Sequence, residues 1–227
     1  MKTIRILPLV LLTLIGLGRG AAARQTDVRT PENADEARMN RLQPPDKVLD
    51  VFGVRSGMTV AEIGAGRGRY AVQLSVRVGP AGKVYAEDID AEALDHLRQR
   101  CRRWRLENIE AVLGEVSDPR LPEGRLDLIA IVCSYHHFAD PVALLRRART
   151  ALKPGGRLAI GEWIAIHEAG RRSRSPEEIV AEVESAGFAL EQTDPFLKAN
   201  NFMIYLFRRS DADAGRGGRM AGGSTSS

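Results

Sequence analysis

The chain has 227 residues, of which 44% are hydrophobic, 27% are charged and only 5% are aromatic, and its formal net charge is +4. This length suits one domain with short flexible ends. Nucleic-acid-binding proteins usually concentrate basic charge beside aromatic residues, so this weak excess argues against a nucleic-acid partner. Two cysteines are too few for a disulfide framework, and nothing in the sequence sets an oligomeric state.

Residues 1–23 have the three parts of a secretory signal peptide. Lys2 and Arg5 form a positive start, residues 6–17 form an apolar run, and Ala21-Ala22-Ala23 offers a cleavage site. The run is shorter than the about 20 residues that a bilayer span needs. We therefore expect cleavage near Ala23, a periplasmic or secreted protein, and no stable membrane span afterwards. The alternative is a cytoplasmic protein, or one anchored in the membrane by an uncleaved signal.

Residues 24–43 are interpreted as a polar linker that leads, from residue 36, into a helix interrupted at Pro44-Pro45. From Gly57 onward, short apolar runs alternate with amphipathic stretches, which is typical of parallel strands covered by helices. We expect the main domain to span 44–209 and a disordered tail to span 210–227, where Gly, Ser and Ala dominate.

The domain is expected to contain seven strands, with helices between most of them. Ser175, Pro176 and Glu178 form a capping box that opens the last helix. The last two strands are too close in sequence for a crossover helix, so they are expected to pair antiparallel. The predicted strands are 59–63, 83–88, 109–113, 126–132, 157–162, 188–192 and 201–208, and the predicted helices are 90–104, 141–152 and 176–187.

A glycine-rich turn joins the first strand to the first helix. Gly64, Gly66 and Gly68 alternate with Ala65 and Arg67, and such a turn lets backbone approach a ligand closely. Dinucleotide-binding enzymes use the spacing Gly-x-Gly-x-x-Gly, which is not the spacing found here. The acidic Glu62 just before the turn disfavours a pyrophosphate and suits a cofactor with a cationic amino-acid end. S-adenosyl-L-methionine has such an end and no phosphate.

Acidic residues also follow the next two strands. Asp88 ends the second strand, where a carboxylate accepts hydrogen bonds from both ribose hydroxyls, a feature shared with NAD enzymes. Glu115 follows the third strand, where an acidic group meets the amino group of adenine. Their order after successive strands favours a nucleoside-containing cofactor.

These motifs, in this order, resemble the class I S-adenosylmethionine-dependent methyltransferases over about residues 44–208. The resemblance implies an α/β, doubly wound, Rossmann-like sheet of seven strands in the order 3-2-1-4-5-7-6, with strand 7 antiparallel. The motifs that carry it are Val60 to Gly68, Val84 to Asp90, Gly114-Glu115, Asp127 in Asp-Leu-Ile, and Leu152-Lys-Pro-Gly-Gly-Arg157. The residues implied for cofactor binding are Glu62, Gly64, Ala65, Gly66, Gly68, Asp88, Ile89, Glu115 and Val132.

Within this family the sequence is most similar to small-molecule enzymes, such as the quinone-biosynthesis and arsenite methyltransferases. It also resembles exported bacterial methyltransferase-like proteins with Tyr-His-His after strand four. The Asn/Asp-Pro-Pro-Tyr motif of DNA and protein amino-group methylation is absent, as are the cysteine sets of the arsenite enzymes.

The candidate catalytic residues are Tyr135, His136 and His137, which follow the fourth strand. A neutral imidazole near its reference pKa of about 6.5 can act as a general base toward an acceptor. No metal site is expected, because His96 and His167 lack ligand spacing. The sequence therefore predicts methylation of a small molecule. An exported cofactor-binding protein without transferase activity is the alternative, and Glu62 and the glycine spacing argue against a nicotinamide-dependent dehydrogenase.

Overall fold

The computed structural model describes residues 28–164, 167–168, 171–172, 174–195 and 197–210. The signal peptide predicted at 1–23 and the tail predicted beyond residue 210 lie outside these ranges. None of the described helices has the length and apolarity needed to cross a membrane.

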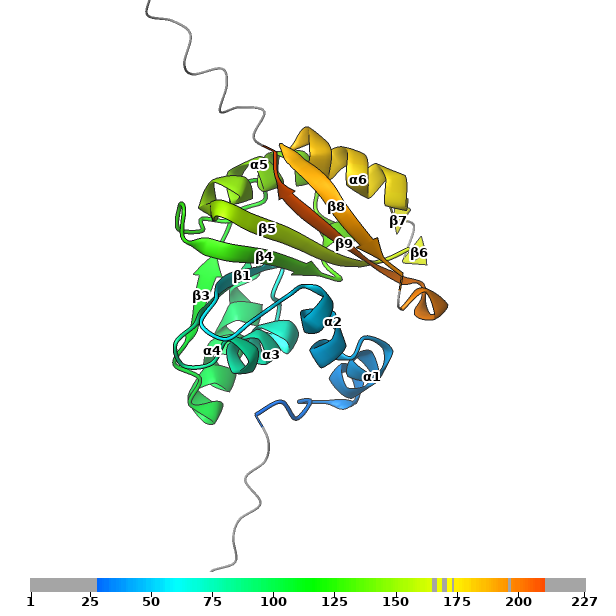
Figure 1. The fold of residues 1–227 in the computed structure, drawn as a ribbon. Coiled ribbons are helices and arrows are strands. Elements are labelled where there is room, and N and C mark those ends of the chain that lie inside the picture. The colour runs from blue at the N-terminus through cyan, green and yellow to red at the C-terminus, as the bar shows by residue number, and fades with distance from the viewer. Residues whose placement is uncertain (1–27, 165–166, 169–170, 173, 196, 211–227) are drawn as a thin grey trace, which may run out of the picture.

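The centre of the fold is one seven-stranded sheet with the order β3-β2-β1-β4-β5-β9-β8 (Figure 1). β1 to β5 pair in parallel, whereas β9 pairs antiparallel with both β5 and β8. The predicted strand order and the antiparallel final strand are confirmed. The strands are β1 (Thr59–Ile63), β2 (Lys83–Asp88), β3 (Ile109–Leu113), β4 (Leu126–Val132), β5 (Leu152–Trp163), β8 (Phe188–Asp194) and β9 (Phe202–Arg209).

Six α-helices are seen in the described ranges, and they cover both faces of the sheet. Figure 1 shows α1 to α4 on one face and α5 and α6 on the other. The helices are α1 (Ala34–Leu42), α2 (Pro45–Val51), α3 (Arg69–Val78), α4 (Ala91–Trp104), α5 (Pro141–Ala151) and α6 (Pro176–Ser185), with short 3₁₀ turns η1 (Tyr135–His137) and η2 (Lys198–Asn200). A small hairpin, β6 (His167–Glu168) with β7 (Arg171–Arg172), was not predicted.

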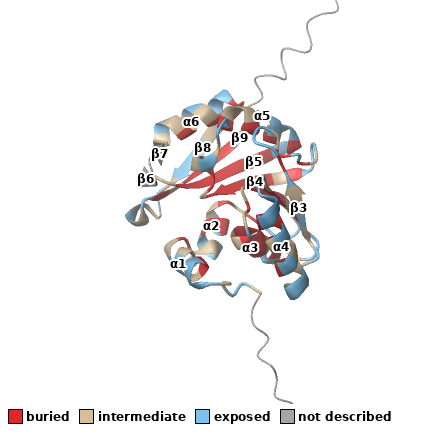
Figure 2. Cartoon of the chain, turned by 180° about the vertical axis from the view of Figure 1, so that it is seen from behind, coloured by how far each residue is buried: buried red, intermediate tan, exposed pale blue. Residues whose placement is uncertain are grey.

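The core consists of two buried clusters, one on each face of the sheet (Figure 2). β4 is buried on both faces and therefore reads as an almost continuous apolar run, as central parallel strands do. Its side chains alternate between the clusters: Leu128 and Val132 join the cluster of α2, α3 and α4, and Ile129 and Ile131 join that of α5 and α6. This packing fixes the carboxyl end of β4 at the centre of the molecule.

Local sequence signals explain most helix boundaries. The Asp90 side chain accepts hydrogen bonds from the first backbone N–H groups of α4, and the predicted capping box of α6 is present. The helix predicted from residue 36 begins earlier, at Ala34, and is broken before α2, which has Pro45 at its first position. β5 already begins at Leu152, because Leu152 pairs with Leu126 ahead of a β-bulge, so the Pro-Gly-Gly turn lies inside the strand.

Candidate functional site

A cavity of about 440 Å³ lies at the carboxyl ends of β1, β2 and β4. Ligands of open α/β sheets bind at this edge, where the strand order reverses. Six of the residues predicted for the site line the cavity, namely Gly64, Gly66, Asp88, Ile89, Glu115 and His137. The predicted Ala65 and Val132 are buried beside it, and neither they nor Gly68 lines it.

The glycine-rich turn connects the ends of three strands. Gly64 has a φ of +76°, and its N–H donates to the backbone oxygen of Glu87 over 2.9 Å. A Cβ at position 64 would overlap the side chain of Ser134, whose hydroxyl donates to the Ile63 oxygen over 2.9 Å. Gly68 has a φ of +87°, and a Cβ there would overlap Leu97. Positions 64 and 68 therefore require glycine, both for backbone conformation and for space.

Asp88 is held at the mouth of the cavity by backbone donors. One carboxylate oxygen accepts from the N–H of Gly66 over 2.7 Å, and the other accepts from the N–H of Asp90 over 2.9 Å. Ile89 and Val116 line the same cavity, although their side chains are 59% and 53% exposed. Exposed apolar side chains suit contact with the flat face of a base, and the fixed carboxylate beside them suits the hydroxyls of its sugar.

Glu62 lies on β1, two residues before Gly64, and does not itself line the cavity. Its side chain is buried, and its Oε2 atom has no hydrogen-bond partner among the described residues. Burial raises the pKa of Glu62 to about 8, opposed by the Arg69 charge and assisted by Asp88. A buried carboxyl group with an unused oxygen fits a neighbouring cationic group and opposes a phosphate, so these residues fit S-adenosylmethionine.

Glu87 is a buried acid of the cavity wall that was not predicted as a site residue. Burial, with the charge of Asp88 second, raises its pKa to about 8. Gly114 packs so closely against this carboxyl group that a Cβ there would overlap it. The sequence signal for Glu87 was the Glu-Asp pair that ends β2, from which only Asp88 was predicted to bind the cofactor. Glu115, predicted to meet adenine, lines the cavity but is ion-paired with Arg120.

The three candidate catalytic residues occupy η1 and take three different environments. Tyr135 is fully buried in the core, and its hydroxyl donates to Glu182 over 2.9 Å. His137 lines the cavity. His136 lies beside β5: its Nδ1 is 3.0 Å from Oε1 of Glu162, and its backbone N–H donates to Oε2 over 3.2 Å. The side chain of Glu162 is only 3% exposed, so this carboxylate fixes the imidazole.

Cys133 and Gln43 were not predicted as site residues. Cys133 follows β4 with a φ of +55°, lines the cavity, and has its Sγ 2.9 Å from Nε2 of Gln43. Burial, with the Glu162 charge second, raises the pKa of the Cys133 thiol to about 12, so the thiol is neutral. Gln43 is fully buried and follows α1, a segment that periodicity alone assigned to a linker and the start of a helix.

The fold and the site together fit an α/β domain for a nucleoside-containing cofactor with a cationic end. A family model described as "Methyltransferase domain" matches residues 60–156. The chain is 34% identical over 116 residues to the ubiquinone/menaquinone biosynthesis C-methyltransferase UbiE of Hahella chejuensis, covering 51% of this chain and 47% of that protein. It is 30% identical over 113 residues to a protein-L-isoaspartate O-methyltransferase of Methanothrix thermoacetophila, covering 50% and 51%.

Among solved structures, a SAM-dependent methyltransferase from Aquifex aeolicus is similar with a TM-score of 0.69 and 27% identity, covering 76% of this chain and 96% of that one. The [4+2]-cyclase SpnF shares the fold at 14% identity, with a TM-score of 0.64 and coverage of 74% and 81%. The chain spans about half the length of the two methyltransferase relatives it matches. In sequence over residues 60–156 and in fold, the chain is similar to the class I S-adenosylmethionine-dependent methyltransferases, and S-adenosyl-L-methionine is the cofactor that this similarity indicates.

Proposed function

We propose that this protein transfers a methyl group from S-adenosylmethionine to a small-molecule acceptor, with His136 as the general base. The single observation that carries the base assignment is the 3.0 Å contact between His136 and the buried Glu162. Cys133 connects the cavity to this pair of residues: it lines the cavity, and the charge of Glu162 acts on its thiol. His136 is not itself among the residues that line the cavity, but its ring lies 4.0 Å from that of His137, which does line it.

Residues in and beside the cavity would each contact a different part of the cofactor. Asp88 would accept the ribose hydroxyls, Ile89 and Val116 would cover the base, and Glu62 would face the cationic amino-acid end. When bound, S-adenosylmethionine supplies a methyl group activated by a sulfonium. The chain must then orient an acceptor and take up its proton, the two contributions that proteins make to such displacements.

Glu162 supports proton transfer by fixing the tautomer of His136. A carboxylate only accepts hydrogen bonds, so the hydrogen of the neutral imidazole lies on Nδ1 and the lone pair lies on Nε2. Nε2 is then the atom that takes the proton from an acceptor O–H, N–H or C–H group. The buried negative charge of Glu162 stabilises the imidazolium that results.

The acceptor is proposed to be a small molecule because the site is a concave cavity of about 440 Å³ rather than an extended groove. Cavities of this size fit a cofactor and a compact acceptor. Methylation by UbiE, named as a C-methyltransferase of quinone biosynthesis, is consistent with this acceptor class.

The test compares His136→Ala with the wild type in the formation of S-adenosylhomocysteine from S-adenosylmethionine and a small-molecule extract. The variant is expected to lose turnover by about 10²–10⁴-fold while its affinity for S-adenosylhomocysteine stays within about twofold, because base and cofactor contacts are separate. Glu162→Gln should reduce turnover in the same direction. His137→Ala tests whether the neighbouring imidazole, which lines the cavity, is the base instead. Wild-type turnover in His136→Ala would remove the base assignment, and no methyl transfer by the wild type to any acceptor fraction would refute the proposed activity.

A further inference from the structure

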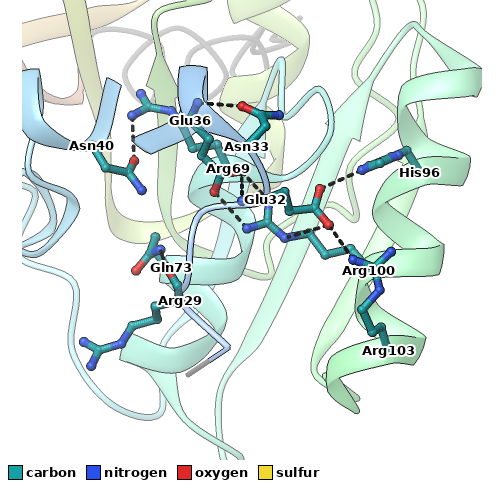
Figure 3. Close-up of polar contacts among 10 residues, drawn as sticks. All are labelled: Arg29, Glu32, Asn33, Glu36, Asn40, Arg69, Gln73, His96, Arg100 and Arg103. Atoms are coloured by element: carbon teal, nitrogen blue, oxygen red, sulfur yellow. Dashed lines mark hydrogen bonds and ion pairs between the residues drawn. The ribbon is translucent and has the colours of Figure 1, made fainter. Parts of the chain in front are cut away.

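A buried ion pair links the N-terminal helix α1 to α4 (Figure 3). The guanidinium of Arg100 donates to both carboxylate oxygens of Glu36, over 3.2 and 2.8 Å. The Arg100 side chain is 1% exposed and that of Glu36 is 8% exposed. Glu36 also receives the Glu32 N–H over 3.2 Å, and its own N–H donates to Asn33 over 2.8 Å. The start of the helix therefore has one defined position on α4.

Glu32, two residues before α1, adds a second and more exposed set of contacts to α4. Its carboxylate lies 2.6 Å from Nε2 of His96 and 3.1 Å from Nη1 of Arg103. Burial alone would raise the pKa of Glu32, but the His96 hydrogen bond and the charges of Arg100 and His96 lower it overall. The Arg103 side chain is 58% exposed, so its contribution is screened by solvent.

The other end of α1 contacts the site. Arg69, at the start of α3, donates to Asn40 over 3.1 Å and to Oε1 of Gln43 over 2.7 Å. The Gln43 amide also lies 2.9 Å from Sγ of Cys133, which lines the cavity. The hydroxyl of Tyr70 donates to the backbone oxygen of Gln43 over 3.3 Å. α1 thus joins α4 at one end to α3 and β4 at the other.

The position of Gln43 sets where the Arg69 charge lies. That charge acts on the buried carboxyl group of Glu62 and on the Cys133 thiol. If α1 and the Gln43 that follows it shifted, Arg69 would lose both acceptors there and would be free to pair with Glu62. A guanidinium paired with Glu62 would put a positive charge where the cationic end of a cofactor has to lie. Buried ion pairs often fix one arrangement more than they add net stability, which suits Glu36 and Arg100 to this task.

We propose that α1 positions one end of the methyl-transfer site through Gln43, which contacts Cys133 and Arg69, and that Gln43 and Arg100 are positioning residues, with Arg100 acting through Gln43. This inference rests on the proposed function only in assigning the Cys133 end of the cavity to methyl transfer. It extends the site to a helix outside the residues matched by the family model, 60–156.

The test uses the full chain with Cys101→Ser, so that Cys133 is its only thiol. The rate at which iodoacetamide alkylates Cys133 reports whether Gln43 still covers it. Arg100→Met and Gln43→Ala are each expected to raise this rate by about tenfold, because thiol reactivity follows access. Both should weaken S-adenosylhomocysteine binding, measured by calorimetry, by about tenfold. The double variant should be no worse than the worse single variant, since residues that act through one another are not additive.

Arg103→Met is the matched control, because it removes an exposed contact between the same two segments, and it should change neither readout. If Arg100→Met does not fold, Glu36→Gln replaces it and retains one hydrogen-bond acceptor. A lower melting temperature for Arg100→Met, with wild-type alkylation and wild-type affinity, would overturn the proposal. So would additive losses in the double variant. If the wild type binds no S-adenosylhomocysteine, the proposed function fails, whereas the alkylation rates still decide the role of α1.

Discussion

The two halves of the strand-end edge are built from different kinds of contact. The half carried by β1, β2 and β3 relies on backbone groups: the N–H groups of Gly64, Ala65 and Gly66 bind groups at the end of β2. The half carried by β4 and β5 relies on side chains from distant segments, such as Gln43 with Cys133. A backbone-built site is sensitive to an added Cβ, whereas a side-chain-built site is sensitive to the loss of one functional group.

The largest effect is expected where the halves meet, at Gly64. Gly64→Ala should lower the free energy of unfolding by about 2–4 kcal/mol, because a left-handed backbone strains alanine and its Cβ overlaps Ser134. Gly155→Ala is the matched control: Gly155 has the same φ of +76° but nothing within 4 Å of its Cβ, so only the strain of about 1–2 kcal/mol remains. Urea denaturation measures both. Equal losses would mean that Ser134 moves aside and that the halves are less tightly joined than described.

A smaller effect is expected from replacing Asp88, which belongs only to the half carried by β1, β2 and β3. Asp88→Ala should weaken S-adenosylhomocysteine binding by about 1.5–3 kcal/mol, the range for hydrogen bonds to a charged group. Turnover at saturating cofactor should change little, because the His136–Glu162 pair is untouched. Titration calorimetry gives the affinity, and Asp88→Asn, which still accepts the Gly66 N–H, serves as the control. Unchanged affinity in Asp88→Ala would place the ribose contact elsewhere.

The smallest effect is expected from the titration of Glu62, which lies on β1 two residues before Gly64. Its pKa is about 8 in the folded protein and near 4.5 in the unfolded chain, so the folded state holds an extra proton between these values. Stability is therefore highest below the unfolded value and falls as pH rises toward 8, by at most about 1.4 kcal/mol per pH unit for one group. Glu87 acts with the same sign.

Urea denaturation of the cofactor-free protein at pH 6, 7 and 8 measures this slope. Glu62→Gln should reduce it, because the amide does not titrate, while the remaining slope reports Glu87. A slope unchanged by Glu62→Gln would show that Glu62 is ionised in the folded state.

The difference between the halves also explains what the sequence made predictable. β1 to β4 coincide with their predicted ranges. β1 and β4 are buried over almost their whole length, and buried parallel strands are nearly continuous apolar runs bounded by turn residues. The glycine turn and Asp88 were predictable because they belong to one short chain segment with fixed spacing. Their assignment to cofactor binding stays a prediction.

The contacts in the half carried by β4 and β5 were harder to predict from the sequence. Gln43 and Glu162 reach Cys133 and His136 only through the fold, and no spacing links them in the sequence. The adjacent Tyr135, His136 and His137 could not be told apart, because a 3₁₀ turn sends neighbouring side chains in different directions. Tyr135, grouped with the two histidines as a catalytic candidate, packs in the core with Glu182.

The place of β9 has a consequence for biosynthesis. Among the described residues β9 is the last strand in sequence, yet it lies between β5 and β8, and its Phe202, Ile204 and Phe207 are buried in the two cores. While the ribosome extends the chain, β5 keeps an unpaired edge and β8 has no partner in the sheet until Phe202–Arg209 emerges. An open edge of this kind invites pairing with other chains. The nascent protein therefore remains open to aggregation until its final strand is made, and a stop codon before residue 202 would leave a product that cannot close its sheet.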